Sequence, residues 1–121
     1  MKKYFKRMAR RIVAIYANRI YRQAVKLAER RHSEDRQSRY FVISDPRNER
    51  KLMVISAEEF VAVRKRMGLS SKQCPLSMIT AGCWYMTANA NGTGRMDAAE
   101  AMKRKYALVL DLQRLAGLAT S

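Results

Sequence analysis

Apolar residues recur at intervals of three or four over the first thirty-one positions, the spacing that places side chains on one face of an α-helix. Residues 2–31 contain neither glycine nor proline, so the pattern predicts one long, uninterrupted helix. We expect its apolar stripe to pack against the rest of the domain, with basic residues on the opposite side. The predicted stripe consists of Phe5, Ala9, Ile12, Tyr16, Ile20, Ala24 and Leu27.

After a polar connector, 32–38, two runs rich in aromatic and β-branched residues predict strands at 39–44 and 51–55. The segment between them has turn chemistry, because Pro46 fixes φ and an Asp and an Asn support local turns. The pattern therefore predicts a β-hairpin. Since an isolated hairpin is marginally stable in water, we expect it to lie against a helix.

Ser56 and Glu59 form the sequence signature of a capping box, which predicts a second helix that Gly68 ends. The basic triplet 64–66 in its last turn suits the helix dipole, and phosphate contact is the alternative. The residues expected to pack this helix on the core are Phe60, Val63 and Met67.

The run 76–86 is nearly all apolar and follows Pro75, a residue that suits the first turn of a helix. It predicts the most buried helix, although a strand also fits a run of this length. We expect Trp84 and Tyr85 to be core residues rather than a platform on which bases stack.

A small polar loop, 87–94, leads to a final helix over 97–116, whose triplet 103–105 is expected to point outward. Together the elements predict an α+β fold: a long basic N-terminal helix, one β-hairpin and three further helices. The length indicates one small domain, 1–121, made of the basic amphipathic helix 2–31, the hairpin 39–55 and a helical part, 57–118.

Positive charge is concentrated at the start of the chain. Residues 1–31 contain eleven Lys or Arg and one acidic residue, Glu29, so they carry +10 of the formal net charge of +15. This distribution predicts a polyanionic partner. Among the uses of a basic amphipathic helix we place nucleic acid first, because tyrosines interleave with the arginines, and an anionic membrane surface behind it.

Other classes of protein find little support. Cys74 and Cys83 lie nine positions apart, and with a single His in the chain they cannot supply a zinc site. No paired carboxylates, phosphate loop or nucleophile elbow is present, so we expect neither an enzyme nor a cofactor. The longest early apolar run, 12–17, is too short for a transmembrane segment, and we expect a soluble protein of a bacterial cytoplasm, with association with a virion as the alternative.

Residues 89–100 resemble an EF-hand calcium loop, with oxygen-bearing side chains at loop positions one, three, five and nine and Glu100 at position twelve. Only Asp97 and Glu100 are acidic, and Arg95 adds a cation, so we expect no metal site. The simpler interpretation is that Asp97 caps the final helix and Glu100 completes a capping box.

The chain also resembles small, basic, uncharacterised proteins of Bacteroides phages, prophages and mobile elements. The resemblance rests on the Lys/Arg/Tyr-rich opening helix, the pair of runs 40–43 and 51–56, and Cys83-Trp84-Tyr85 before a Gly/Asn loop and a basic final helix. It implies a short accessory protein that works beside nucleic acid or in a virion.

These observations predict a small, non-enzymatic accessory protein that binds DNA or RNA through the phosphate backbone. The alternative is a virion structural protein, or an inhibitor or adaptor that docks on an acidic protein partner. The sequence leaves the oligomeric state open. The residues expected to contact phosphates are Lys2, Lys3, Lys6, Arg7, Arg10, Arg11 and Arg22.

Overall fold

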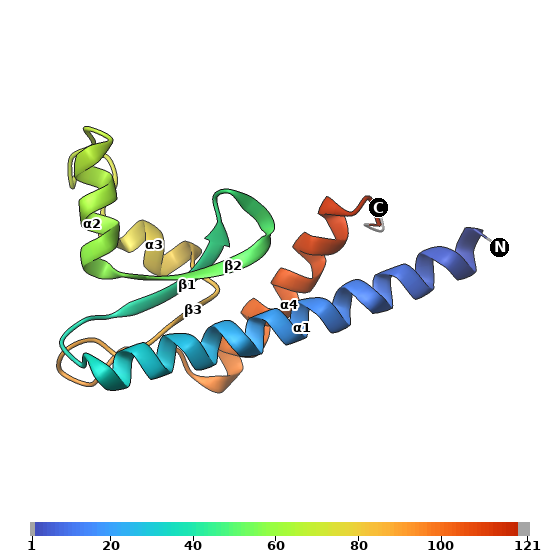
Figure 1. The fold of residues 1–121 in the computed structure, drawn as a ribbon, viewed down its shortest axis with the longest axis horizontal. Coiled ribbons are helices and arrows are strands. Elements are labelled where there is room, and N and C mark those ends of the chain that lie inside the picture. The colour runs from blue at the N-terminus through green and yellow to red at the C-terminus, as the bar shows by residue number, and fades with distance from the viewer. Residues whose placement is uncertain (1, 119–121) are drawn as a thin grey trace.

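The computed structural model describes residues 2–118, and of Lys2 only the backbone. The fold is α+β, as the sequence predicts, and a long N-terminal helix runs beneath a small sheet (Figure 1). The elements in chain order are α1 (Lys2–Glu34), β1 (Tyr40–Asp45), β2 (Asn48–Ser56), α2 (Ala57–Arg66), α3 (Leu76–Gly82), β3 (Tyr85–Met86) and α4 (Ala98–Leu115).

The predicted hairpin is confirmed and is tighter than expected, because β2 begins at Asn48 and the turn is short. Phe41 pairs with Ile55 on β2 and with Met86 on β3, so β1 is the central strand of an antiparallel sheet ordered β2-β1-β3. Phe41 and Val42 are fully buried, as expected for residues of the central strand.

The predicted helix 76–86 is wrong beyond Gly82. The chain leaves α3 at Cys83 and adds β3 to the free edge of β1. The backbone N–H of Trp84 donates to the Val42 carbonyl at 2.7 Å, and that of Thr87 donates to the Tyr40 carbonyl at 3.0 Å. These bonds satisfy a sheet edge that would otherwise be unpaired, which the apolar pattern alone does not reveal. As predicted, Tyr85 is buried and Trp84 packs against the core.

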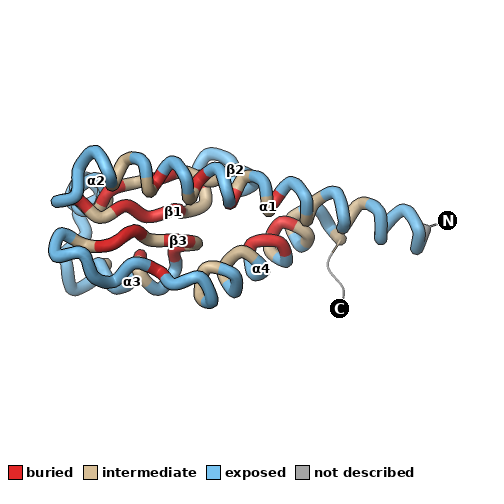
Figure 2. The backbone as a smooth tube through the Cα atoms, turned by 90° about the horizontal axis from the view of Figure 1, so that it is seen from below, coloured by how far each residue is buried: buried red, intermediate tan, exposed pale blue. Residues whose placement is uncertain are grey.

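The long helix is confirmed and runs three residues beyond the predicted end, but the predicted packing face is right only at Ala24, which is buried, and Ile20, which packs against the core. Its buried residues are Ala17, Tyr21, Ala24 and Ala28. This line lies about a quarter turn from the predicted stripe, taking about 100° of rotation per residue. Of the predicted stripe, Phe5, Ile12, Tyr16 and Leu27 are exposed. Figure 2 shows burial along one side of α1 only, next to the sheet and α4.

Small side chains explain this choice of face. The axes of packed elements approach more closely when the residues at the contact are small, and three alanines line the buried side of α1. Tyr21 is the large residue among them, and its hydroxyl donates to the Trp84 carbonyl at 2.8 Å. A hydropathy pattern favours bulky residues, so it selected the wrong side of the helix.

The last helix, α4, packs along α1. Its buried residues are Leu108, Val109 and Leu112, and Gln113 donates to the Arg10 carbonyl of α1 at 3.1 Å. The contact with α4 therefore reaches α1 as far as Arg10. The first turns of α1 project past the body, and residues 3–8 are all exposed.

The capping box at the start of α2 is confirmed. The Ser56 hydroxyl accepts from the Glu59 N–H at 3.0 Å, and the Glu59 carboxylate accepts from the Ser56 N–H at 3.0 Å. Phe60 packs on the core as predicted. The predicted packing of Val63 and Met67 is wrong, because both are exposed on a helix that stands away from the sheet.

Candidate nucleic-acid interface

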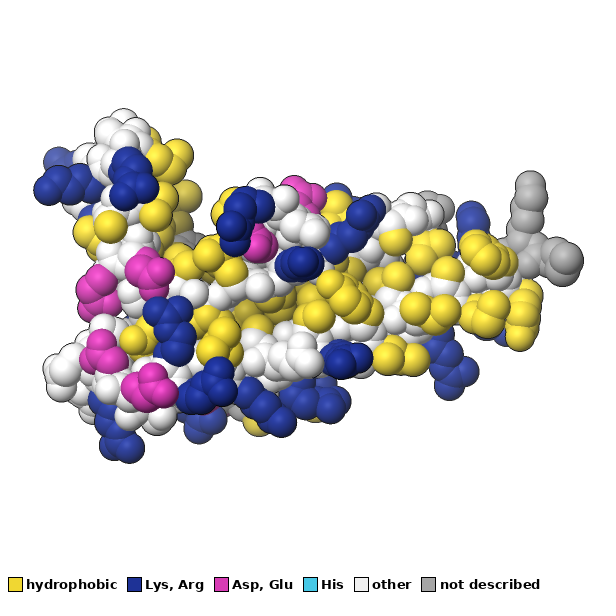
Figure 3. All heavy atoms as spheres, viewed as in Figure 1, with side chains coloured by type: hydrophobic (Ala, Val, Ile, Leu, Met, Phe, Trp, Pro, Cys, Tyr) yellow, Lys and Arg dark blue, Asp and Glu magenta, His cyan; other side chains and the backbone are white. Residues whose placement is uncertain are grey.

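The outward face of α1 carries a row of four basic residues along its second half. We call Arg19, Arg22, Lys26 and Arg30 the basic row. Their spacing of three, four and four places them on one face of the helix, opposite the buried alanines. All four are exposed, and none forms an ion pair within residues 2–118. Figure 3 shows dark blue side chains along the lower edge of the molecule, where α1 lies in Figure 1.

The one acidic residue of the first thirty-one is neutralised by contacts within the fold. Arg95 Nε lies 3.0 Å from Glu29 Oε2, and the Tyr85 hydroxyl lies 3.2 Å from the same carboxylate oxygen. Burial raises the pKa of Tyr85, so its hydroxyl stays protonated near neutral pH. The basic row therefore faces solvent, and Glu29 beside it is held by an arginine.

The structure divides the predicted phosphate contacts into different groups. Arg11 and Arg22 are exposed on the body-supported part of α1, and Arg22 belongs to the basic row. Arg10 is half-buried, and its Nη1 donates to the Leu118 carbonyl at 3.5 Å, so one of its donors is used within the fold. Lys3, Lys6 and Arg7 are exposed on the projecting turns, and the side chain of Lys2 lies outside the described residues.

Sequence reasoning missed Arg19, Lys26 and Arg30. Their regular spacing with Arg22 is visible in the sequence, but the bulky apolar residues indicated a different buried side of the helix. Because the observed buried face of α1 lies opposite them, these three residues point away from the body. Alanines at 17, 24 and 28 were the available signal.

The first half of the same outward face is apolar. We call Phe5, Met8, Ile12 and Ile15 the apolar seam; their spacing of three and four continues directly into Arg19 and Arg22. All four seam residues are exposed, between 44% and 66%. Figure 3 shows yellow side chains gathered toward the N-terminal end of α1.

Several other basic side chains have structural roles. Arg31 donates to the Val54 carbonyl and to Glu59, each at 3.0 Å, and so ties α1 to β2 and α2. Arg104 was expected to point outward, but it is partly buried, donates to the Ala81 carbonyl at 3.0 Å and pairs with Glu100 at 2.9 Å. Arginines used in this way contribute less to a free interface than the basic row does.

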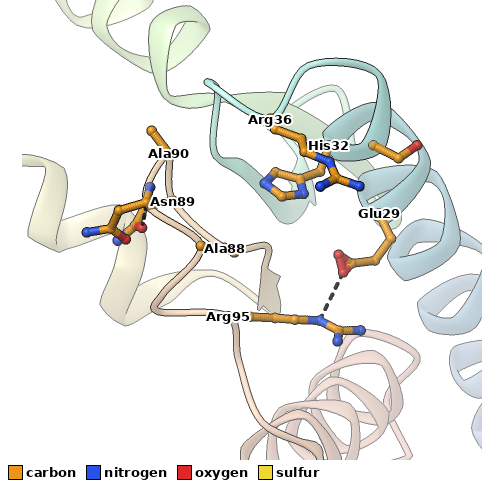
Figure 4. A pocket seen from close by; sticks show the side chains of 10 residues that line it. Glu29, His32, Arg36, Ala88, Asn89, Ala90 and Arg95 are labelled. Carbon is orange, nitrogen blue, oxygen red and sulfur yellow. Dashed lines mark hydrogen bonds and ion pairs between the residues drawn. The ribbon is translucent and has the colours of Figure 1, made fainter.

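A polar pocket of about 610 Å³ lies where the end of α1 meets the loop before α4. Figure 4 shows Glu29 and Arg95 joined on one side, with His32 near the end of α1 and Arg36 in the turn that follows it. Ser33 of α1 also lines this pocket, and its hydroxyl donates to the Arg30 carbonyl at 2.7 Å.

Residues 89–100, the segment similar to an EF-hand loop, use their oxygens within the fold. Asn89 Oδ1 accepts from the backbone N–H groups of Asn91 and Thr93 at 3.3 and 3.2 Å. Asp97 caps α4 as predicted and accepts from the Glu100 N–H at 2.7 Å. The predicted capping box is wrong, because the Glu100 carboxylate pairs with Arg104 instead. Residues 2–118 contain no group of three or more metal-ligating His, Cys, Asp or Glu side chains.

Both cysteines are free thiols, and their environments differ. Cys83 is fully buried, and this burial raises the pKa of its thiol, although the positive charge of Arg104 opposes the shift. A thiol with a raised pKa is a poor nucleophile near neutral pH.

Comparison of the chain with protein-family models, with curated proteins and with solved structures finds no match. Within residues 2–118, no helix is long and apolar enough to cross a bilayer.

Proposed function

We propose that this protein is a non-enzymatic nucleic-acid-binding accessory protein whose contact surface is the basic row of α1. The observation that carries the proposal is that four exposed cations share one face of a helix held rigidly against the body. They have no partner for their charge within residues 2–118, so a polyanion can neutralise them.

The geometry suits a phosphate backbone. From Arg19 to Arg30 the row extends about 16 Å along the helix axis, at about 1.5 Å per residue. Three of the four residues are arginines, whose planar guanidinium groups bind phosphate oxygens through two parallel hydrogen bonds. Because Ala17, Ala24 and Ala28 fix the opposite face of α1, the backbone that carries the row is preorganised, and binding costs the rotamer entropy of the four side chains but little backbone entropy.

The expected mode of binding has low sequence specificity. The contacts are side chains directed at phosphates, and no motif with a known manner of reading base edges is present. Affinity should therefore be similar for unrelated sequences of the same length. The phage or mobile-element setting is an expectation from the resemblance alone, and the assay below does not depend on it.

The test compares two variants that lose the same charge. In the first, Arg19, Arg22, Lys26 and Arg30 are changed to Gln. In the control, four exposed basic residues elsewhere are changed to Gln; they are Lys65, Arg66, Lys72 and Lys103. Fluorescence anisotropy with labelled duplex DNA, single-stranded DNA and RNA gives the affinity of each protein.

The row variant should bind at least about a hundredfold more weakly than the wild type, since four charge-assisted contacts are lost. The control should stay within a few-fold. Equal loss in both variants would show that binding follows net charge and not this surface. Absence of binding by the wild type at low salt would refute the proposal, and an acidic protein partner would then be sought by pull-down.

A further inference from the structure

The apolar seam of α1 lies outside the hydrophobic core that residues 2–118 form. The exposed fractions of Phe5, Ile12 and Ile15 are 66%, 61% and 63%, and that of Met8 is 44%. Tyr4 and Tyr16 flank the seam and are also exposed. Six large apolar or aromatic side chains thus cover one continuous side of the first half of α1. Contiguous exposed patches of this kind mark binding surfaces in soluble proteins.

The rest of this half-helix is strongly basic. Residues 1–16 contain six Lys or Arg and no acidic residue. With about 100° per residue, Lys3, Lys6 and Arg10 lie on the side of the helix opposite the seam, and Arg7 and Arg11 lie between the two sides. A helix with separate apolar and basic sides is the type that lies in the interface of a membrane, with its basic stems reaching toward the headgroups.

We propose that the apolar seam docks on an anionic lipid surface, with α1 lying in the plane of the membrane and not across it. Charge complementarity selects this occupant. Anionic headgroups attract the basic side chains of this half-helix. A second copy of this chain would bring an equally basic half-helix alongside this one, and the two like charges would repel.

The size of the seam also argues against a second copy. From Phe5 to Ile15 the seam covers about 15 Å of helix axis. The four seam residues and the two tyrosines beside them are far fewer than the roughly 20–30 residues that each partner of a stable complex contributes. A bilayer sets no such minimum, because each inserted apolar side chain adds its own transfer free energy.

The seam and the basic row share the outward face of α1, and this has a consequence for binding. When the seam is inserted, the row faces the headgroups and not solvent. Membrane and nucleic acid would therefore compete for one surface. This last statement rests on the proposed function, whereas the lipid docking of the seam does not.

The experiment measures binding to vesicles of phosphatidylglycerol mixed with phosphatidylcholine, and to vesicles of phosphatidylcholine alone. In the seam variant Phe5, Ile12 and Ile15 are changed to Ser, which leaves the net charge unchanged. Ile, Phe and Ser have similar helix propensities, so α1 should persist, as circular dichroism can verify. The control variant changes three other exposed apolar residues to Ser: Val63, Met67 and Met102.

The wild type should bind the anionic vesicles and not the neutral ones. The seam variant should bind at least about tenfold more weakly, and the control should match the wild type. In the same preparations the affinity of the seam variant for DNA should be unchanged, which separates this proposal from that for the basic row. If the row fails to bind DNA, the vesicle result still stands alone.

Two results would overturn the proposal. If the seam variant binds anionic vesicles as tightly as the wild type, the attraction is purely electrostatic and the seam has no part in it. If the wild type does not bind anionic vesicles, the proposal of a lipid partner is wrong. Light scattering that then shows a dimer, which the seam substitutions dissociate, would assign the seam to a second copy.

Discussion

The Tyr21 hydroxyl donates a hydrogen bond to the Trp84 carbonyl oxygen at 2.8 Å. This bond joins the middle of α1 to the segment that enters β3, two parts of the chain far apart in sequence. Burial raises the pKa of Tyr21, so the hydroxyl keeps its proton and remains a donor at any ordinary pH. The bond holds the helix that presents the basic row.

Tyr21→Phe should lower the free energy of unfolding by about 1 kcal/mol, because a buried hydrogen bond is lost and the carbonyl keeps no equivalent partner. Urea denaturation followed by circular dichroism measures the change. Tyr106→Phe is the matched control, since its side chain is 64% exposed, and it should have no effect. An equal effect of the two substitutions would contradict the structural role given to Tyr21.

Ala28→Leu should destabilise the fold by about 1–3 kcal/mol, because a fully buried alanine leaves no room for a larger side chain where α1 meets the body. Ala107→Leu on α4 makes the same chemical change at an exposed position and should be nearly neutral. Thermal unfolding of both variants measures the difference. A stabilised Ala28→Leu protein would show that the buried face of α1 is not the alanine face.

The sequence patterns correctly predicted the features that depend on contacts between residues close in the chain. The capping box of Ser56 and Glu59 and the hairpin around Pro46 involve residues close in sequence, and both form as expected. The face of α1 and the strand β3 depend on distant partners. The alanines can be recognised as the packing side only when the sheet is in place, and Trp84 leaves the helical path because β1 offers it hydrogen bonds.

The candidate site was likewise predictable in part, and its remaining features depend on distant contacts. Its location on the N-terminal helix and its positive charge were predictable from composition, because eleven basic residues stand among the first thirty-one. The choice of residues was not, because it needs the rotation of the helix. Arg10, which the sequence favoured, contacts the chain end beyond α4, whereas Arg19 and Arg30 are free on the outward face.

Stability should depend on pH through Glu59. Partial burial tends to raise the pKa of Glu59, but hydrogen bonds from the Ser56 N–H and from Arg31 outweigh it and hold the pKa below its ordinary value. A depressed pKa contributes stability that is present above the unfolded-state pKa and is lost as the pH falls through the folded-state pKa.

Glu59→Gln should therefore flatten the stability curve between about pH 5 and pH 3, by no more than about 1 kcal/mol for a half-exposed ion pair. Urea midpoints at a series of pH values give the curve. Glu58→Gln is the control at the neighbouring exposed position. Parallel curves for the wild type and Glu59→Gln would contradict the contribution assigned to this carboxylate.

The two thiols should react at very different rates. Cys83 is fully buried and its thiol has a raised pKa, whereas Cys74 is partly exposed. A disulfide reagent at about pH 8 should therefore modify Cys74 quickly and Cys83 slowly. Cys74→Ser should abolish the fast phase, and urea should make Cys83 fast. Rapid modification of both thiols in the folded protein would contradict the burial of Cys83.

The dependence of DNA affinity on salt tests the central claim most directly. For duplex DNA the slope of log K against log salt is about −0.9 per neutralised phosphate, so removing the four charges of the basic row should reduce its magnitude by about 3 to 4. The matched variant with four charges removed elsewhere should change the slope by less than about 1. This result would place the phosphate contacts on the outward face of α1. An unchanged slope in the row variant would contradict that placement.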